Sequence, residues 1–216
     1  MNLLYYLLLL VIVFLSIIIM KINIDYSPKK IKIYIVVALS LFVLRNIALL
    51  SLNILNNSSG ISNLRYLVFL DYILIPLLML PIWYIFLRSE KIKFAVCIYI
   101  SLAILTIYSV IIHLTKIIVR VSLNYGFVIT SEQGIEKYLL IILILFLGVI
   151  ATLDVLFIDK GNVNKKGKIY EVLGIIFIIG EQICLNGGIF FFPYSVFSEL
   201  IVLSLRSYAI FSFKIK

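Results

Sequence analysis

Histidine and cysteine are scarce in this chain, which has one histidine and two cysteines among its 216 residues. His113 has no acidic or cysteine neighbour at a spacing that would bind a metal ion. Cys97 and Cys184 both lie in apolar stretches and do not bracket a loop, so we expect them to be small buried hydrophobic side chains. The sequence therefore predicts no metal, no cofactor and no catalytic residue, which favours a protein that is not an enzyme.

Charged residues are also few, at 13% of the chain against 64% hydrophobic residues, and the mean hydropathy is +1.21. No stretch is polar enough to form a water-soluble domain. A bilayer core of about 30 Å needs about 20 apolar residues per helix. Seven stretches meet this requirement, at about 3–20, 32–54, 65–87, 94–115, 138–158, 169–190 and 194–213. We predict an all-α polytopic membrane protein, a seven-transmembrane-helix bundle that forms a single domain over residues 1–216.

The first apolar stretch lacks the marks of a cleaved signal peptide. No positively charged side chain precedes Leu3, and no small-x-small cleavage site follows Ile19. We therefore expect this stretch to be retained as the first helix of the bundle.

Positive charges gather in alternate loops between the predicted helices, and this gives the bundle a direction. Lys and Arg accumulate on the cytoplasmic side of membrane proteins. The loops after the first, third and fifth spans, with the C-terminus, contain Lys21, Lys29, Lys30, Lys32, Arg88, Lys91, Lys93, Lys160, Lys165, Lys166, Lys168, Lys214 and Lys216. The other loops are neutral (56–60), uncharged (191–193) or of mixed charge (116–137). We predict a multi-pass protein of the cell membrane with its N-terminus outside and its C-terminus in the cytoplasm.

The same distribution of charge identifies the expected partners. The net charge of +9 is divided among short loops at the predicted membrane surface, so we expect it to contact anionic lipid head groups and not nucleic acid. A cytoplasmic signalling partner could also bind these loops.

The longest predicted loop, about 116–137, contains two short runs with high β-propensity. Residues 117–121 and 127–130 are rich in β-branched side chains, and Asn124, Tyr125 and Gly126 between them indicate a turn. This pattern predicts either a small hairpin over the outer mouth of the bundle or a loose loop with local turns.

Eight polar side chains interrupt four of the apolar stretches, although an ionisable group in a bilayer is costly. At a rise of about 1.5 Å per residue, Arg45, Asp71 and Glu181 fall at similar depths in the outer half. Arg206 follows Glu199 by seven residues on the same helix face. We expect the two arginines, Arg45 and Arg206, to neutralise two of the three acids Asp71, Glu181 and Glu199. The predicted ligand-binding residues of an outward-facing polar pocket are Arg45, Asn46, Asp71, Glu181, Gln182, Asn186, Glu199 and Arg206. The alternative is a structural ion-pair network that fixes the packing of the helices.

Other polar or helix-breaking residues in the spans have local explanations. Asp154 and Glu171 lie near the cytoplasmic ends of their helices, so we expect them to face water or the basic linker. Pro76 and Pro81 should free backbone carbonyl groups in the third span and bend it.

Three groups of residues resemble one family of bacterial sensors. They are the third span and its exit (71–76 and 81–88), the connection from 113–114 to 125–129, and the final span from 192–195 to 209–211. The resemblance spans most of the chain, and these groups are similar to the N-terminal seven-helix sensor region that precedes bacterial histidine kinases and diguanylate cyclases. The resemblance implies that the helices receive a signal. No phosphoacceptor histidine box, ATP-binding glycines or cyclase signature follows before Lys216, so either the protein acts through a partner or the output domain belongs to a longer chain.

These features favour a sensor or receptor-like membrane protein that responds to a ligand or partner through the outer pocket and signals through its cytoplasmic loops. The alternative is a small-molecule or ion transporter that uses the same charged residues as its substrate site. We find no internal repeat between the first three and last three spans, which weakens a transporter built from duplicated halves. An intramembrane enzyme that uses paired acids such as Asp71 and Glu181 is a third alternative.

Overall fold

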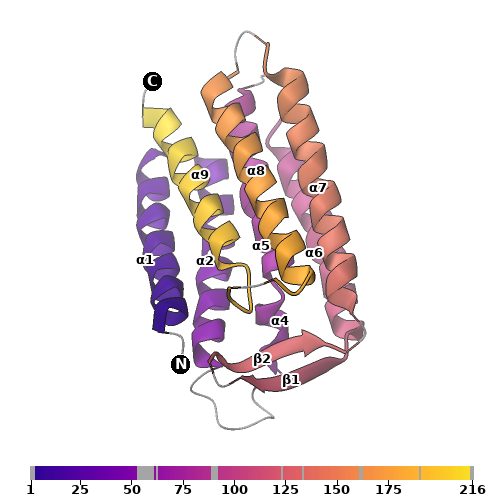
Figure 1. Ribbon diagram of the computed structural model, residues 1–216. Coiled ribbons are helices and arrows are strands. Elements are labelled where there is room, and N and C mark those ends of the chain that lie inside the picture. Colours follow the sequence, from indigo (N-terminus) through magenta and orange to yellow (C-terminus); the bar gives the residue numbers. More distant parts are fainter. Residues whose placement is uncertain are drawn as a thin grey trace.

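The computed structural model describes residues 3–52, 61, 63–88, 92–122, 124–132, 134–160, 163–189 and 191–214. The structure is 79% helical. Its elements are α1 (Leu3–Tyr26), α2 (Lys29–Ser51), α4 (Arg65–Val68), α5 (Asp71–Leu87), α6 (Ala95–Leu114), β1 (Ile117–Ser122), β2 (Gly126–Ser131), α7 (Ile135–Phe157), α8 (Lys165–Asn186) and α9 (Val196–Lys214) (Figure 1). The predicted neutral loop at 56–60, Lys91 and Lys216 lie outside the described residues.

Among the described residues, seven helices are long and apolar enough to cross a membrane, when α4 and α5 are counted as one span. The expected apolar helices are therefore present, but several extend beyond their apolar core. The helix α1 continues to Tyr26, past the predicted end at residue 20, because a helical backbone does not need to stop where polar side chains begin. Asn23 in this extension donates a hydrogen bond to the carbonyl oxygen of Lys32 at 3.1 Å and so stabilises the turn into α2.

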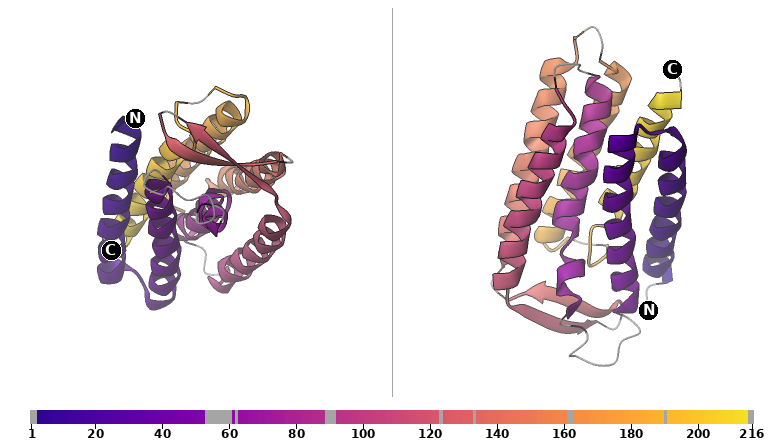
Figure 2. Two further views of the ribbon diagram at one scale, coloured as in Figure 1. Left: turned by 90° about the horizontal axis from the view of Figure 1, so that it is seen from below. Right: turned by 180° about the vertical axis from the view of Figure 1, so that it is seen from behind.

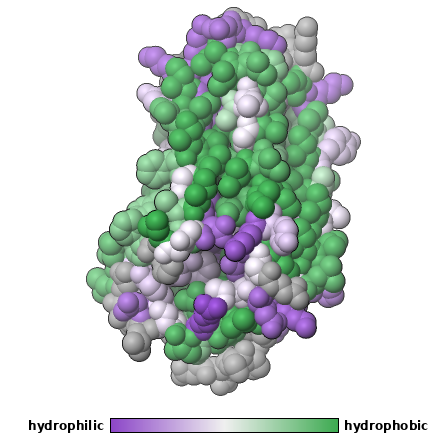
Figure 3. All heavy atoms as spheres, turned by 45° about the vertical axis from the view of Figure 1, so that its right-hand side comes forward, coloured by the Kyte–Doolittle hydropathy of each residue, from purple (hydrophilic) through white to green (hydrophobic). Residues whose placement is uncertain are grey.

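The helix α5 is the centre of the bundle. In the span that α5 forms with α4, 89% of an 18-residue apolar stretch is buried. The buried share of the corresponding stretch in each of the other six helices is 50% or less. It contacts α2, α6, α7, α8 and α9, and α1 packs on α2 and α9 at one side (Figure 2). Hydrophobic side chains face outward along the middle of the bundle, and hydrophilic residues gather towards its two ends (Figure 3).

The two ends of the bundle differ. The strands β1 and β2 lie across one end, next to the N-terminus, and we name it the hairpin end (Figure 1). The α1–α2 turn, the α7–α8 connection and the C-terminus lie at the other, which we name the opposite end. The strands pair antiparallel, with Ile117 opposite Ser131 and Ser122 opposite Gly126. A hairpin and not a loose loop therefore occupies this segment, as one of the two sequence-based alternatives predicted.

Pro81 leaves one backbone carbonyl group in the central helix without its usual partner. The missing N–H would have bonded to the carbonyl oxygen of Leu77, one turn earlier. The hydroxyl group of Tyr34 on α2 donates to this oxygen at 2.9 Å and also lies 2.6 Å from the hydroxyl oxygen of Ser101 on α6. The proline thus links three helices through a polar contact in an otherwise apolar core.

Four sequence-based expectations about burial are wrong. Lys168 was expected in a basic loop, and Asp154 and Glu171 were expected to face water or the basic linker, but all three side chains are fully buried inside the bundle. Each lies at the end of its apolar stretch and also on the inward face of its helix, and hydropathy along the sequence does not report that rotation. Cys184 is exposed because it lies on the outward face of α8, whereas Cys97 is buried as predicted.

Candidate ligand-binding site

A break in the central span begins the candidate site. Phe69 and Leu70 separate α4 from α5, so the carbonyl oxygen of Val68 is not bonded within a helix. The Nε–H of Arg45 donates to this oxygen at 3.2 Å. The N–H of Tyr72 donates to the carboxylate of Asp71 at 3.0 Å. Charged side chains thus satisfy backbone groups that would otherwise be unpaired in an apolar interior.

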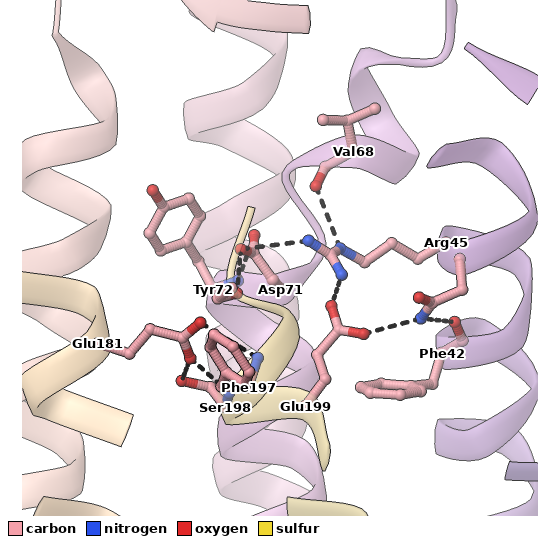
Figure 4. A network of polar contacts seen from close by, with 11 residues as sticks. Phe42, Arg45, Val68, Asp71, Tyr72, Glu181, Phe197, Ser198 and Glu199 are labelled. Atoms are coloured by element: carbon pink, nitrogen blue, oxygen red, sulfur yellow. Dashed lines mark hydrogen bonds and ion pairs between the residues drawn. The ribbon is translucent and has the colours of Figure 1, made fainter. Parts of the chain in front are cut away.

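Arg45 bridges two carboxylates from different helices (Figure 4). Its guanidinium group lies 3.3 Å from Oδ2 of Asp71 on α5 and forms a second ion pair with Glu199 on α9. Arg45 and Glu199 are completely buried, and Asp71 is 6% exposed. Because Arg45 belongs to α2, this one side chain fixes the relative positions of α2, α5 and α9.

Neutral donors complete the network. Nδ2 of Asn46 donates to Glu199 at 3.0 Å, and the hydroxyl group of Ser195 donates to Asp71 at 3.0 Å. Asp71 and Glu199 each lie in the first turn of a helix, where the helix dipole favours negative charge. These donors and dipoles allow two carboxylates to share one arginine.

Glu181 has a different role from the one predicted for it. Its carboxylate accepts hydrogen bonds from the backbone N–H groups of Phe197 and Ser198, and from the hydroxyl group of Ser198 (Figure 4). The first N–H groups of a helix have no intrahelical partners. Glu181 on α8 therefore caps α9 and does not pair with either predicted arginine.

A cavity of about 550 Å³ lies beside Asp71 at the hairpin end, between the hairpin, the α4–α5 break, α7 and α8. Figure 3 shows hydrophilic residues gathered towards this end of a mostly hydrophobic face. The polar residues of the cavity wall are Asp71, Tyr72, Arg120, Ser122, Tyr125, Thr130, Glu136, Gln182, Asn186, Tyr194 and Ser195. Its apolar wall is Val68, Phe69, Val121, Val128, Ile129, Leu140, Leu185 and Pro193.

Three of the eight predicted site residues line this cavity, namely Asp71, Gln182 and Asn186. Arg45, Asn46 and Glu199 lie behind Asp71 in the ion-pair network. The structure therefore contains a cavity and an ion-pair network side by side, and Asp71 belongs to both.

Arg206 does not join the network. It is fully buried, and none of its three guanidinium nitrogen atoms has a hydrogen-bond partner among the described residues. The expectation that Arg206 neutralises one of the three acids is wrong, because Arg45 alone pairs with both Asp71 and Glu199.

Sequence reasoning missed the side of the cavity that the hairpin and α7 supply. Arg120 lies in β1, and Glu136 in the first turn of α7 accepts a hydrogen bond from the N–H of Ser131 at 2.5 Å. Tyr194 accepts a hydrogen bond from the N–H of Ile129 at 3.1 Å and so joins the hairpin to the α8–α9 connection. The mixed charge of the loop was the available signal, but only the strand pairing places these residues over the bundle.

Two donors in the wall are available to a bound molecule. Nε2 of Gln182 is buried and has no hydrogen-bond partner among the described residues. Burial raises the pKa of the Tyr194 hydroxyl group, which therefore stays protonated and retains an O–H to donate. With the apolar wall, these donors fit a small amphipathic molecule that carries a hydrogen-bond acceptor. Among the described residues, no three His, Cys, Asp or Glu side chains gather in an arrangement that could hold a metal ion.

No protein-family model matches the chain, and no curated protein is significantly similar to it in sequence.

Proposed function

We propose that this protein is a receptor-like sensor of the cell membrane that binds a small amphipathic molecule in the cavity at its hairpin end. The seven apolar helices and the outward-facing hydrophobic side chains support a position in a bilayer. Lysines such as Lys21, Lys29, Lys165 and Lys166 belong to the opposite end, which supports a cytoplasmic location for that end. The hairpin end and the N-terminus would then lie outside.

One observation supports coupling between the cavity and the opposite end. Asp71 lines the cavity and shares Arg45 with Glu199 near the start of α9. A ligand that bonds to Asp71 would weaken its pairing with Arg45 and leave Arg45 more strongly held by Glu199. Since α9 continues to the opposite end, a shift of this helix would change the surface offered to a cytoplasmic partner (Figure 1).

Replacing Asp71 with asparagine tests this coupling without a ligand. The substitution leaves Arg45 and Glu199 as a balanced pair, so we expect the bundle to stay folded while α9 shifts by about 1–2 Å, as packed helices do in switching proteins. Spin labels on cysteines introduced at Ile169 and Phe211, both exposed, would report the distance between α8 and α9. Cys97 and Cys184 are first replaced by alanine.

The matched control is Asp159→Asn, because the Asp159 side chain is 92% exposed and pairs with Lys165 at the surface. It should leave the distance distribution unchanged. An unchanged distribution in the Asp71→Asn variant would contradict the proposed coupling.

A transporter is the second candidate, and a specific observation favours it. The cavity lies at the hairpin end, whereas a buried cluster of Lys168, Asp154 and Glu171 holds α7 and α8 together at the other. Transporters use such paired charges to close one side while the other is open. Accumulation of a bound compound inside proteoliposomes would favour transport, and binding without accumulation would favour the sensor.

A further inference from the structure

A second buried charge cluster lies at the opposite end, and the proposed ligand-binding function does not use it. Lys168 on α8 forms ion pairs with Asp154 on α7 and with Glu171 one turn further along α8. Its Nζ lies 3.3 Å from Glu171, bonds more closely to Asp154, and donates to the carbonyl oxygen of Trp83 on α5 at 3.1 Å. The cluster thus links α5, α7 and α8.

In the part of the chain that the structure describes, the cluster contains two carboxyl groups but one cation, and its side chains have no contact with solvent. Lys168, Asp154 and Glu171 are each 0% exposed. Among the described residues, the groups that act on each carboxyl group are the ammonium group of Lys168 and the other carboxyl group. The ring of Trp83 adds only a cation–π contact, 5.2 Å from Nζ. With both acids ionised, the cluster would hold an uncompensated negative charge in an apolar interior, which is strongly unfavourable.

Two oxygen atoms of the cluster have no partner. Oδ2 of Asp154 and Oε1 of Glu171 are buried and accept no hydrogen bond from any described residue. Both carboxyl groups pair with the same Nζ of Lys168, so they lie close to each other. A hydrogen bond between them would require a hydrogen atom on one of them, because two carboxylates are both acceptors.

We propose that Asp154, Lys168 and Glu171 form a proton-binding site that holds one proton shared between the two carboxyl groups. One proton converts one carboxylate to a carboxylic acid, brings the cluster to zero net charge and supplies the missing donor. Glu171 is the protonated partner, since Lys168 bonds more closely to Asp154. If the opposite end opened to water, Glu171 would release its proton to the solvent and become a carboxylate.

The network around Arg45 also has two acids and one cation, but it does not need a bound proton. Asn46 and Ser195 donate hydrogen bonds to its carboxylates, and both acids lie at helix N-termini. Asp154 lies in the last turn of α7, where the helix dipole disfavours negative charge. The opposite end therefore binds a proton where the hairpin end uses neutral donors.

Infrared spectroscopy of the purified chain in lipid nanodiscs at neutral pH tests this site. A protonated carboxyl group has a carbonyl stretching band that a carboxylate lacks. We expect Glu171→Gln to remove one such band and to leave the protein folded, because the amide can donate the same hydrogen bond to Asp154. We expect Asp154→Asn to remove the same band, since Glu171 then becomes the ionised partner of Lys168.

Two further variants complete the test. Lys168→Met should increase the intensity of the carboxylic acid signal from this site about twofold, because both acids must then be neutral in an apolar interior. Asp159→Asn, at the surface of the same end, should leave the band unchanged. Survival of the band in either Glu171→Gln or Asp154→Asn, or failure of Glu171→Gln to fold, would overturn the proposal.

Discussion

Replacing Arg45 with methionine should lower the free energy of unfolding by about 3–5 kcal/mol, the usual cost of removing one partner from a buried ion pair. The substitution leaves Asp71 and Glu199 with no cation, and it also removes the donor to the carbonyl oxygen of Val68. The midpoint of unfolding in mixed detergent micelles with increasing SDS would measure the loss.

Neutralising the acids should reverse much of this loss. In the triple variant Arg45→Met, Asp71→Asn, Glu199→Gln, no buried charge remains in the network, so we expect it to be more stable than Arg45→Met alone. Arg65→Met is the matched control, because Arg65 is only partly buried and contacts the ring of Tyr66 and the carbonyl oxygen of Thr115. If Arg45→Met lowered the free energy of unfolding no more than Arg65→Met does, the role assigned to Arg45 would be contradicted.

Replacing the second buried arginine, Arg206, with methionine should raise the free energy of unfolding instead of lowering it. Arg206 is fully buried without an ion pair or hydrogen bond among the described residues, and an arginine does not lose its proton in a protein. Arg206→Met removes an uncompensated charge and retains a similar length of side chain. We therefore expect the free energy of unfolding to rise by about 1–4 kcal/mol.

The SDS titration used for Arg45→Met measures this gain directly. Arg206→Lys is the control, since it keeps the charge and should give no stabilisation. A loss of stability in Arg206→Met would mean that the guanidinium group binds a compensating anion, and would contradict its description as an unpaired charge.

The helices of this protein could be predicted from the sequence because length and hydropathy determine them almost alone. A run of about 20 apolar residues has few alternatives to a membrane helix. The hairpin was predicted only as one of two alternatives, since its short strands depend on pairing with each other and on contacts such as Ile129 with Tyr194.

The sequence predicted the depth of the charged side chains in the bundle better than it predicted their ion-pair partners. A constant rise per residue placed Arg45 and Asp71 at one level, and the structure pairs them. The rotation of each helix about its axis, and which neighbour it faces, do not follow from the sequence alone. Glu181 therefore caps α9, Arg206 faces no acid, and Lys168 points into the bundle.

Cysteine labelling in intact cells tests the central claim most directly, namely that the cavity at the hairpin end opens outside the cell. Single cysteines would replace Ser122 in the cavity wall and Asp159 at the opposite end, after Cys97 and Cys184 are changed to alanine. We expect a membrane-impermeant maleimide to label Ser122→Cys in intact cells and Asp159→Cys only after the membrane is permeabilised. Labelling of Asp159→Cys in intact cells, with Ser122→Cys protected, would contradict the proposed orientation and function.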